Sequence, residues 1–202
     1  MRLYRPCFLM RFLFPEALFR IKTNEKVLCL TFDDGPHPGS TPHLLNTLDR
    51  RGIKALFFCN GNAAEKYPEL IKQIALKGHL IGNHGYSHLN GWKTDTLRYS
   101  EDVKRAAGMT SAKIFRPPYG RLTMKQDKIL TKQYRLVFWD LMPYDFEPHF
   151  GADGSLKILK KKIRSGSIIV LHDTPESTAL SFLNEFIDFA SARGFRFVVP
   201  DF

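Results

Sequence analysis

The sequence has few cysteines, no long hydrophobic run and a shortage of acidic residues. Its three cysteines, Cys7, Cys29 and Cys59, lie far apart without a paired spacing, so a disulfide framework is not expected. No segment reaches the roughly 18 uninterrupted apolar residues of a membrane-spanning helix. The 20 Asp and Glu residues are outnumbered by 30 Lys and Arg residues, which gives a formal charge of +10. Such a charge either favours anionic partners in general or simply keeps the surface soluble.

The chain of 202 residues fits one globular domain, and its 44% apolar content is enough for a sizeable core. We expect residues 27–202 to form this domain, and residues 1–26 to be an N-terminal extension packed on it or lying at a surface.

The N-terminal extension combines basic and apolar residues. Arg2 and Arg5 precede apolar stretches, but Arg11 and Pro15 interrupt them and no small-residue cleavage site follows. The segment is therefore a poor match to a secretory signal. A basic, aromatic surface would suit peripheral contact with an anionic membrane. A cytoplasmic or membrane-peripheral location is favoured, with export as the alternative.

Short apolar runs alternate with helical patterns along the rest of the chain. The expected strands are residues 27–32, 54–59, 79–82, 113–115, 135–141, 167–171 and 196–200. Between them, apolar residues recur at helical spacing, as in Leu44, Leu45 and Leu48. This alternation predicts an α/β fold with a mostly parallel sheet, open or closed into a barrel.

Unusual polar residues follow the expected strands, at the sheet edge where active sites form in α/β folds. Asp33 and Asp34 come directly after the first strand and before a Gly-Pro turn. Two adjacent carboxylates repel each other, so keeping both ionised calls for a metal ion or an arginine nearby. A surface turn that uses aspartate for its turn chemistry is the alternative.

A pair of histidines, His84 and His88, follows the third expected strand. Within one helical turn, imidazoles four residues apart lie on the same side, a spacing that metal sites use. Two unrelated surface or core histidines would show the same spacing. The acidic strand end that precedes them favours one shared site.

Further polar residues come after later strands. Arg116 could pair bidentately with a carboxylate and keep it charged, or form a structural ion pair. His172 suits proton transfer near neutral pH, unless it is an ordinary core histidine. Asp145 could orient an imidazole or be an ordinary loop acid.

In this order and spacing, the residues resemble the polysaccharide deacetylases, the NodB-homology domain of carbohydrate esterase family four. The resemblance is carried by the TFDDGP string at 31–36, the pair His84 and His88, and the RPPY string at 116–119. It implies a distorted (β/α) barrel of about seven parallel strands, in agreement with the strand pattern. It also implies a hydrolase that removes acetyl groups, above all N-acetyl groups of N-acetylglucosamine-type residues in peptidoglycan, chitin-like or other glycans.

The resemblance implies a role for each matched position. The implied ligands of a divalent metal ion are Asp34, His84 and His88. Zinc is the expected metal, with Co²⁺, Ni²⁺, Mn²⁺ or Fe²⁺ as alternatives. Asp33 would be the general base with Arg116 as its charge partner, and His172 the general acid held by Asp145. The Tyr119 backbone N–H would stabilise the oxyanion. The implied walls of the substrate pocket are Pro117, Phe146 and Leu171.

Two positions depart from the family pattern, because Met142 and Phe146 stand where many members carry Asp and Trp. Phe146 can still form an apolar wall for an acetyl group together with Leu171. Since the other roles are filled, an active enzyme that takes an acetylated oligo- or polysaccharide is expected.

Other functions stay open at this point. An O-acetyl esterase or a deacylase of a lipid-linked sugar would use the same residues. Two histidines and a carboxylate also form the facial triad of iron(II) oxygenases, although Asp33 and His172 favour hydrolysis. A basic module that binds an anionic glycan through a degenerate site is the alternative of another class. Specific nucleic-acid binding is not expected, because no aromatic-basic RNA motif or recognition-helix pattern is present.

Overall fold

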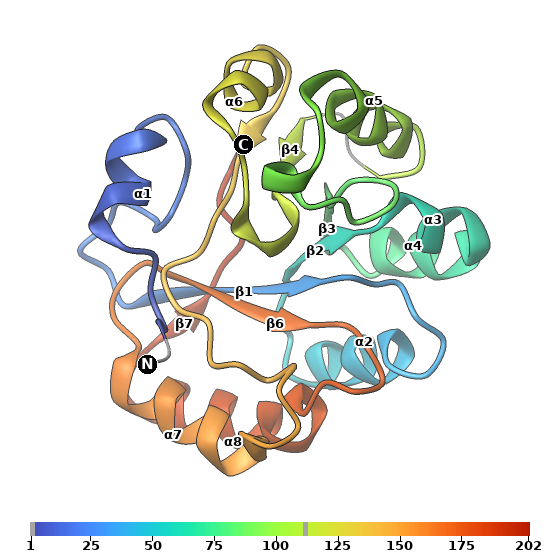
Figure 1. The fold of residues 1–202 in the computed structure, drawn as a ribbon. Helices are drawn as coiled ribbons and strands as arrows, with labels where there is room; N and C mark the ends of the chain where they lie inside the picture. Colours follow the sequence, from blue (N-terminus) through green and yellow to red (C-terminus); the bar gives the residue numbers. More distant parts are fainter. Residues whose placement is uncertain (1–2, 111–112) are drawn as a thin grey trace.

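The structure, a computed structural model, describes residues 3–110 and 113–202 and is built around one parallel sheet (Figure 1). The strands are β1 (Val27–Asp33), β2 (Leu56–Cys59), β3 (Leu80–Asn83), β4 (Ile114–Phe115), β5 (Arg135–Leu136), β6 (Ser167–His172) and β7 (Arg196–Phe197). Their order across the sheet is β5-β4-β3-β2-β1-β6, and β7 pairs with the first residues of β1. The predicted parallel α/β fold is confirmed.

The sheet curls into a distorted barrel, and its open side is closed by chain outside the main strands. Leu141 forms an isolated parallel bridge with Ile169 of β6, and Leu18 forms another with Val137. The expected strand at 135–141 was too long for this reason. Beyond Leu136 the chain leaves the β4 ladder and crosses toward β6, where the Leu141 N–H donates to the Ile168 carbonyl.

Helices cover the outside of the curled sheet, and α7 lies beside α8 below β1 and β6 in Figure 1. The helices are α1 (Phe8–Leu13), α2 (Thr41–Arg50), α3 (Gly61–Lys66), α4 (Pro68–Leu76), α5 (Thr96–Ala107), α6 (Met124–Leu130), α7 (Gly151–Lys162) and α8 (Ala179–Ala192). Two short 3₁₀ turns, η1 (Gly91–Lys93) and η2 (Pro118–Gly120), lie in the connections next to the cleft described below.

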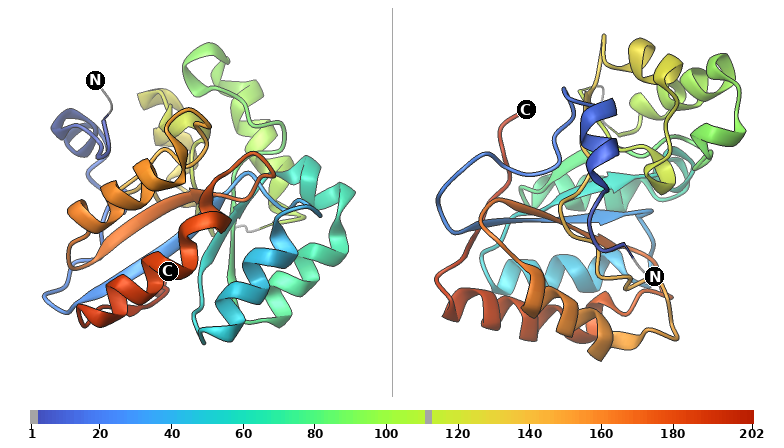
Figure 2. Two further views of the ribbon diagram at one scale, coloured as in Figure 1. Left: turned by 90° about the horizontal axis from the view of Figure 1, so that it is seen from below. Right: turned by 60° about the vertical axis from the view of Figure 1, so that its left-hand side comes forward.

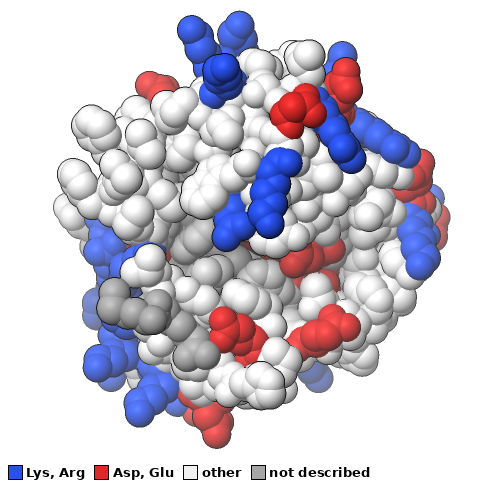
Figure 3. Space-filling model, viewed as in Figure 1, with Lys and Arg blue, Asp and Glu red and all other residues white. Residues whose placement is uncertain are grey.

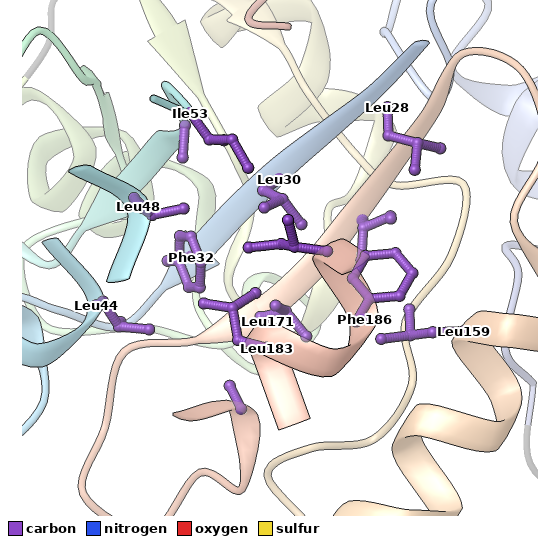
Figure 4. Packing of buried hydrophobic residues seen from close by; sticks show 14 of the residues in the cluster. Leu28, Leu30, Phe32, Leu44, Leu48, Ile53, Leu159, Leu171, Leu183 and Phe186 are labelled. Carbon is purple, nitrogen blue, oxygen red and sulfur yellow. The ribbon is translucent and has the colours of Figure 1, made fainter. Parts of the chain in front are cut away.

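Alternation along β1 decides which side chains face the helices. Leu28, Leu30 and Phe32 are buried in the largest hydrophobic cluster together with Phe186 of α8 (Figure 4). Each buried side chain of this size is worth about 1.5–3 kcal/mol. A one-residue slip of β1 would turn all three away from the helices. The packing of these side chains against the helices therefore fixes the register of β1.

The opposite face of the same strands carries the polar residues. Cys29 of β1 and Ile168 of β6 lie in a separate cluster inside the curl of the sheet. Because strand side chains alternate, Asp33 shares its side with Cys29, and His172 shares its side with Ile168. Asp33 and His172 are also direct partners in the β1–β6 ladder. The register that buries the core therefore places these two residues side by side at the end of the sheet.

The N-terminal segment lies along the side of the barrel opposite α3 and α4 (Figures 1 and 2). Phe14 and Phe19 are buried, and the Phe19 ring stacks on Phe138 with 4.8 Å between centroids. Arg5 and Arg11 both bond to the carboxylate of Asp140, which has no exposed surface. These contacts hold the segment across the open side of the sheet.

Of the basic residues in this segment, Arg5 and Arg11 are thus directed toward Asp140, and Arg2 lies outside the described residues. The outward face of α1 is apolar instead, with Phe8 83% and Phe12 71% exposed. Contact with a membrane stays a prediction. Within residues 3–110 and 113–202, no helix is long and apolar enough to cross a membrane.

Candidate active site

The polar residues singled out in the sequence meet at the C-terminal ends of the strands, in a cleft of about 330 Å³. Figure 3 shows a hollow near the middle of this face, with Asp or Glu side chains beside it and Lys or Arg on its upper rim. The cleft is lined by Asp33, Asp34, His84, His88, Pro117, Tyr119, Gly120, Arg121, Trp139, Met142, Phe146, Val170 and His172.

Asp33 is fixed by an arginine that is itself completely buried. The Nη1 of Arg116 donates to Asp33 Oδ1 at 2.6 Å and to Thr31 Oγ1 at 2.7 Å. Its Nε and Nη2 donate to the carbonyls of Val137 and Phe138 at 3.1 and 2.8 Å. Burial lowers the pKa of Arg116, and the Asp33 charge opposes that shift. Since an arginine stays protonated in proteins, the pair keeps a charged carboxylate at the end of β1.

Asp34, His84 and His88 form the second group in the cleft. The Oδ1 of Asp34 lies 3.0 Å from His88 Nε2 and 3.5 Å from His84 Nε2. One possible ligand atom from each of the three residues lies within 4.8 Å of the others. The spacing is compatible with a single ion held by all three.

The hydrogen bonding of these residues fits a cation. His84 Nδ1 lies 2.8 Å from the Arg116 carbonyl, which can only accept, so Nδ1 must carry the proton. Burial lowers the pKa of His84 to about 4, so at neutral pH its Nε2 carries a lone pair. That lone pair faces Asp34 Oδ1, a buried oxygen that accepts no hydrogen bond from any described residue. A divalent cation would satisfy both atoms.

The two histidines do not share a helical turn, so that expectation was wrong. Residues 84–88 form a loop after β3, with positive φ at Gly85 (+77°) and at His88 (+53°). The reversal brings the two imidazoles together, with 5.1 Å between ring centroids. The spacing in the sequence thus indicated the correct pair of histidines, but their local structure is a loop and not a helical turn.

Backbone strain is concentrated in this cleft. Of the four non-glycine residues with positive φ in the described chain, three line it: Asp34 (77°), His88 (53°) and Tyr119 (59°). A left-handed conformation costs an L-residue about 1–2 kcal/mol. Such residues persist only where the surroundings impose them, and they gather at functional sites.

Tyr119 also presents a free backbone donor. Among the described residues, its N–H has no acceptor, whereas the next two N–H groups bond to Pro117 and Pro118. The residue belongs to η2, directly after the rigid pair of prolines. An unused N–H at the edge of the cleft is suited to an anionic oxygen.

His172 forms a separate acid–base pair with Asp145. The imidazole Nδ1 lies 3.0 Å from Asp145 Oδ1, and the His172 backbone N–H donates to Asp145 Oδ2 at 2.8 Å. Burial by itself would lower the pKa of His172, but the charge and hydrogen bond of Asp145 outweigh it and raise the pKa to about 9. Ser177 Oγ also donates to Asp145 Oδ2, at 2.7 Å. Nothing in the sequence around Ser177 indicated this contact.

The walls of the cleft differ in part from those expected. Pro117 and Phe146 line it, and the Phe146 ring lies 4.8 Å from the His172 ring between centroids. Leu171 was a wrong choice, because its side chain is fully buried in the large core cluster (Figure 4). Its neighbour Val170 lines the cleft instead. Applying strand alternation from His172 would have found Val170.

A curled parallel sheet with a carboxylate, an imidazole and a three-residue candidate cation site at its C-terminal edge is the arrangement of an α/β-barrel enzyme. The family model for polysaccharide deacetylase matches residues 20–136. The chain is 35% identical over 186 residues to a peptidoglycan-N-acetylglucosamine deacetylase of Bacillus cereus, covering 87% of this chain and 67% of that protein. It is 33% identical over 171 residues to a chitooligosaccharide deacetylase of Azorhizobium caulinodans, covering 80% and 81%.

The fold agrees with these sequence relationships. A crystal structure of a peptidoglycan N-acetylglucosamine deacetylase, in complex with 4-naphthalen-1-yl-N-oxidanyl-benzamide, superimposes with a TM-score of 0.85 at 32% identity. The match covers 91% of this chain and 90% of the other. The chain therefore belongs to the polysaccharide deacetylase family, as a NodB-homology domain of carbohydrate esterase family four.

Proposed function

We propose that this deacetylase removes N-acetyl groups from N-acetylglucosamine-type residues of a glycan in a reaction that depends on a divalent metal ion. The observation that carries the proposal is the ladder pairing of Asp33 with His172 beside Asp34, His84 and His88. A base and an acid thus lie next to one candidate ion site. The names of the two curated relatives, one for peptidoglycan and one for chitooligosaccharides, support this substrate class.

Asp34, His84 and His88 would hold the ion. When bound there, a divalent ion supplies Lewis-acid polarisation of the acyl carbonyl and lowers the pKa of water, to about 7 in well-tuned zinc sites. One carboxylate with two neutral imidazoles suits zinc, while Co²⁺, Ni²⁺, Mn²⁺ and Fe²⁺ also accept such ligands.

Asp33 would act as the general base. Its Oδ1 is occupied by Arg116, and its Oδ2 lies on the side of the ion site, 3.9 Å from His84 Nε2. Oδ2 is therefore the oxygen that takes a proton from the attacking water. Arg116 positions the carboxylate and keeps it charged. As the acetyl carbon becomes tetrahedral, the Tyr119 N–H donates to the developing oxyanion, a contact worth about 3 kcal/mol in comparable sites.

His172 would act as the general acid. Asp145 binds its Nδ1, which leaves Nε2 to give a proton to the sugar nitrogen as the C–N bond breaks. The raised pKa of His172 keeps the imidazole protonated at neutral pH, while Arg116 keeps Asp33 ionised. Base and acid are therefore in opposite protonation states at the same pH, as the reaction requires. The products are acetate and a free amine.

The test is acetate release from N-acetylglucosamine oligomers by purified protein of known metal content. Asp33→Asn and His172→Ala should each lower turnover by about 10²–10⁴-fold, the usual contribution of a general base or acid. His88→Ala should lose metal as well as activity, and chelation should abolish turnover. Asp188→Asn and His43→Ala, at exposed positions away from the cleft, serve as matched controls.

The outcomes separate the alternatives. Bound metal without acetate release from N-acetyl oligomers would overturn the N-acetyl assignment and direct the search to O-acetyl esters and lipid-linked sugars. Oxygen consumption with bound iron would indicate oxygenase chemistry. Salt-sensitive glycan binding without metal or turnover would indicate a binding module.

A further inference from the structure

A tryptophan stands exposed beside the cleft, although the chain has only two. Trp92 lies in η1, in the connection that follows His88, and 65% of it is exposed. An exposed indole offers a large apolar face that is suited to contact with a ligand. Trp92 does not itself line the cleft, so the acid–base residues give no explanation for its exposure.

The turn that carries Trp92 is held rigidly. The indole Nε1 donates to the Leu122 carbonyl at 3.2 Å, and the Trp92 backbone N–H donates to Asn90 Oδ1 at 3.1 Å. The Nε2 of the fully buried Gln126 donates to the carbonyls of Gly91 and Thr94 at 2.9 and 3.1 Å. The indole is therefore positioned before any ligand arrives, which lowers the entropic cost of binding.

The turn also packs directly against the chain that forms the cleft wall. A Cβ on Gly91 would lie 2.3 Å from the Arg121 carbonyl oxygen, so only glycine permits this approach. The Arg121 guanidinium lies 5.1 Å from the Trp92 ring and 6.0 Å from the Tyr119 ring. Arg121 and Tyr119 line the cleft, so they connect Trp92 to it.

Tyr119 completes the connection toward the ion site. Its side chain is 59% exposed, and its ring lies 4.5 Å from that of His88. An aromatic and cationic surface therefore extends from the candidate metal ligands, across Tyr119 and Arg121, to Trp92. We call these last three residues the rim platform.

We propose that the rim platform binds a sugar unit of the glycan next to the one that is deacetylated, with its pyranose ring against the Trp92 indole. This inference rests on the proposed deacetylation of a glycan. The apolar face of a pyranose matches an indole ring, and the Arg121 guanidinium supplies donors for its hydroxyl oxygens. A single tryptophan turn is small compared with the roughly 800 Å² per partner of a stable protein interface, which favours a sugar over a protein.

The kinetic test compares long and short substrates. Trp92→Ala should raise KM for an N-acetylglucosamine hexamer about tenfold more than KM for the single sugar, which has no neighbouring unit, as loss of one stacked ring implies. Trp92→Phe keeps an aromatic face and should stay near the wild-type KM ratio. Leu97→Ala, which shortens another exposed side chain (73%), is the matched control and should leave the ratio unchanged. Equal KM changes for the hexamer and the single sugar in Trp92→Ala would overturn the proposal.

A binding test separates this inference from the proposed function. In an Asp33→Asn background, which prevents turnover, titration with the hexamer should change the tryptophan emission. The change should be clearly smaller in Asp33→Asn/Trp92→Phe, where the only indole left is Trp139, which lines the cleft. If the wild type releases no acetate but the Trp92-dependent change occurs, the proposed reaction fails and the sugar site stands. An emission change of the same size in the double variant would refute the site, as would no change at all.

Discussion

Asp140 should be a main contributor to the stability of the closed barrel. Its carboxylate has no exposed surface and accepts hydrogen bonds from Arg5, Arg11, Arg164 and Ser167. Asp140→Asn keeps the shape of the side chain but replaces one acceptor oxygen with an NH₂ group. The N–H donors of that group would then face the N–H donors of the arginines. Removing one partner of a buried ion pair costs about 3–5 kcal/mol.

The arginines around Asp140 place the expected cost at the lower end of that range. The side chains of Arg5, Arg11 and Arg164 are 27%, 34% and 42% exposed, so water can solvate them when the carboxylate is lost. We therefore expect a loss of about 3 kcal/mol in the free energy of unfolding. For a domain of this size, that loss lowers Tm by about 6–12 °C.

Urea denaturation and thermal unfolding, followed by circular dichroism, would measure this difference. Asp188→Asn is the control, because Asp188 also accepts two bonds from an arginine but is 61% exposed. An exposed pair of this kind is worth about 1 kcal/mol or less. If Asp140→Asn unfolds within 1 kcal/mol of the wild type, or no earlier than Asp188→Asn, the reasoning about the buried cluster is refuted.

The same carboxylate should make stability depend on pH. Burial alone would raise the pKa of Asp140, but bonds from Arg164 and Ser167 and the charge of Arg5 outweigh it and lower the pKa. A depressed carboxyl pKa stabilises the fold above the ordinary value of about 3.9, and this contribution is lost as the pH falls through the folded pKa. Asp140→Asn should therefore show a shallower loss of stability in acid.

Three further predictions concern the cleft and one buried histidine. Asp145→Asn should shift the alkaline limb of the kcat profile to lower pH, because the Asp145 charge that raises the pKa of His172 is removed. Burial lowers the pKa of His79 to about 4 from 6.5, so stability should fall as the pH drops through this interval. His79→Phe should remove that part of the loss in urea titrations. Gly120→Ala should destabilise the protein by about 1–3 kcal/mol and slow acetate release. The reason is that the φ of Gly120 is +63° and a Cβ would lie 2.4 Å from the Trp139 side chain. An unchanged Tm and an unchanged rate would contradict this prediction.

Much of the fold could be predicted because its signals are local and periodic. β1 is buried along its whole length, and its apolar run stands out before Asp33. The fifth strand was misjudged because the apolar run from Leu136 to Trp139 continues past the residue at which the strand ends. Its departure from the sheet depends on contacts with distant segments, such as Leu18 with Val137. Partners so far apart in the chain leave no periodic signal.

The candidate site was predictable in its members more than in its geometry. The position of polar residues after buried strands indicated Asp33, Arg116 and His172. In the structure, Asp33 and His172 line the cleft, and Arg116 binds Asp33. The left-handed backbone at His88 was not predictable, because only glycine and a few other residues announce positive φ in a sequence. Ser177 is a common residue in a polar loop, so its bond to Asp145 had no distinctive pattern.

The ladder pairing of Asp33 with His172 makes the spacing of these two residues independent of the shape of the rim that would contact the polymer. The spacing between these two residues is set by adjacent strands of the central sheet, where the backbone bonds of β1 and β6 leave no freedom to drift. The rim residues, in contrast, come from connections outside the strands. Loops at the rim can therefore be exchanged to accept differently shaped or decorated polymers while the proposed acid–base pair stays in register, which makes this scaffold suited to grafting new specificities.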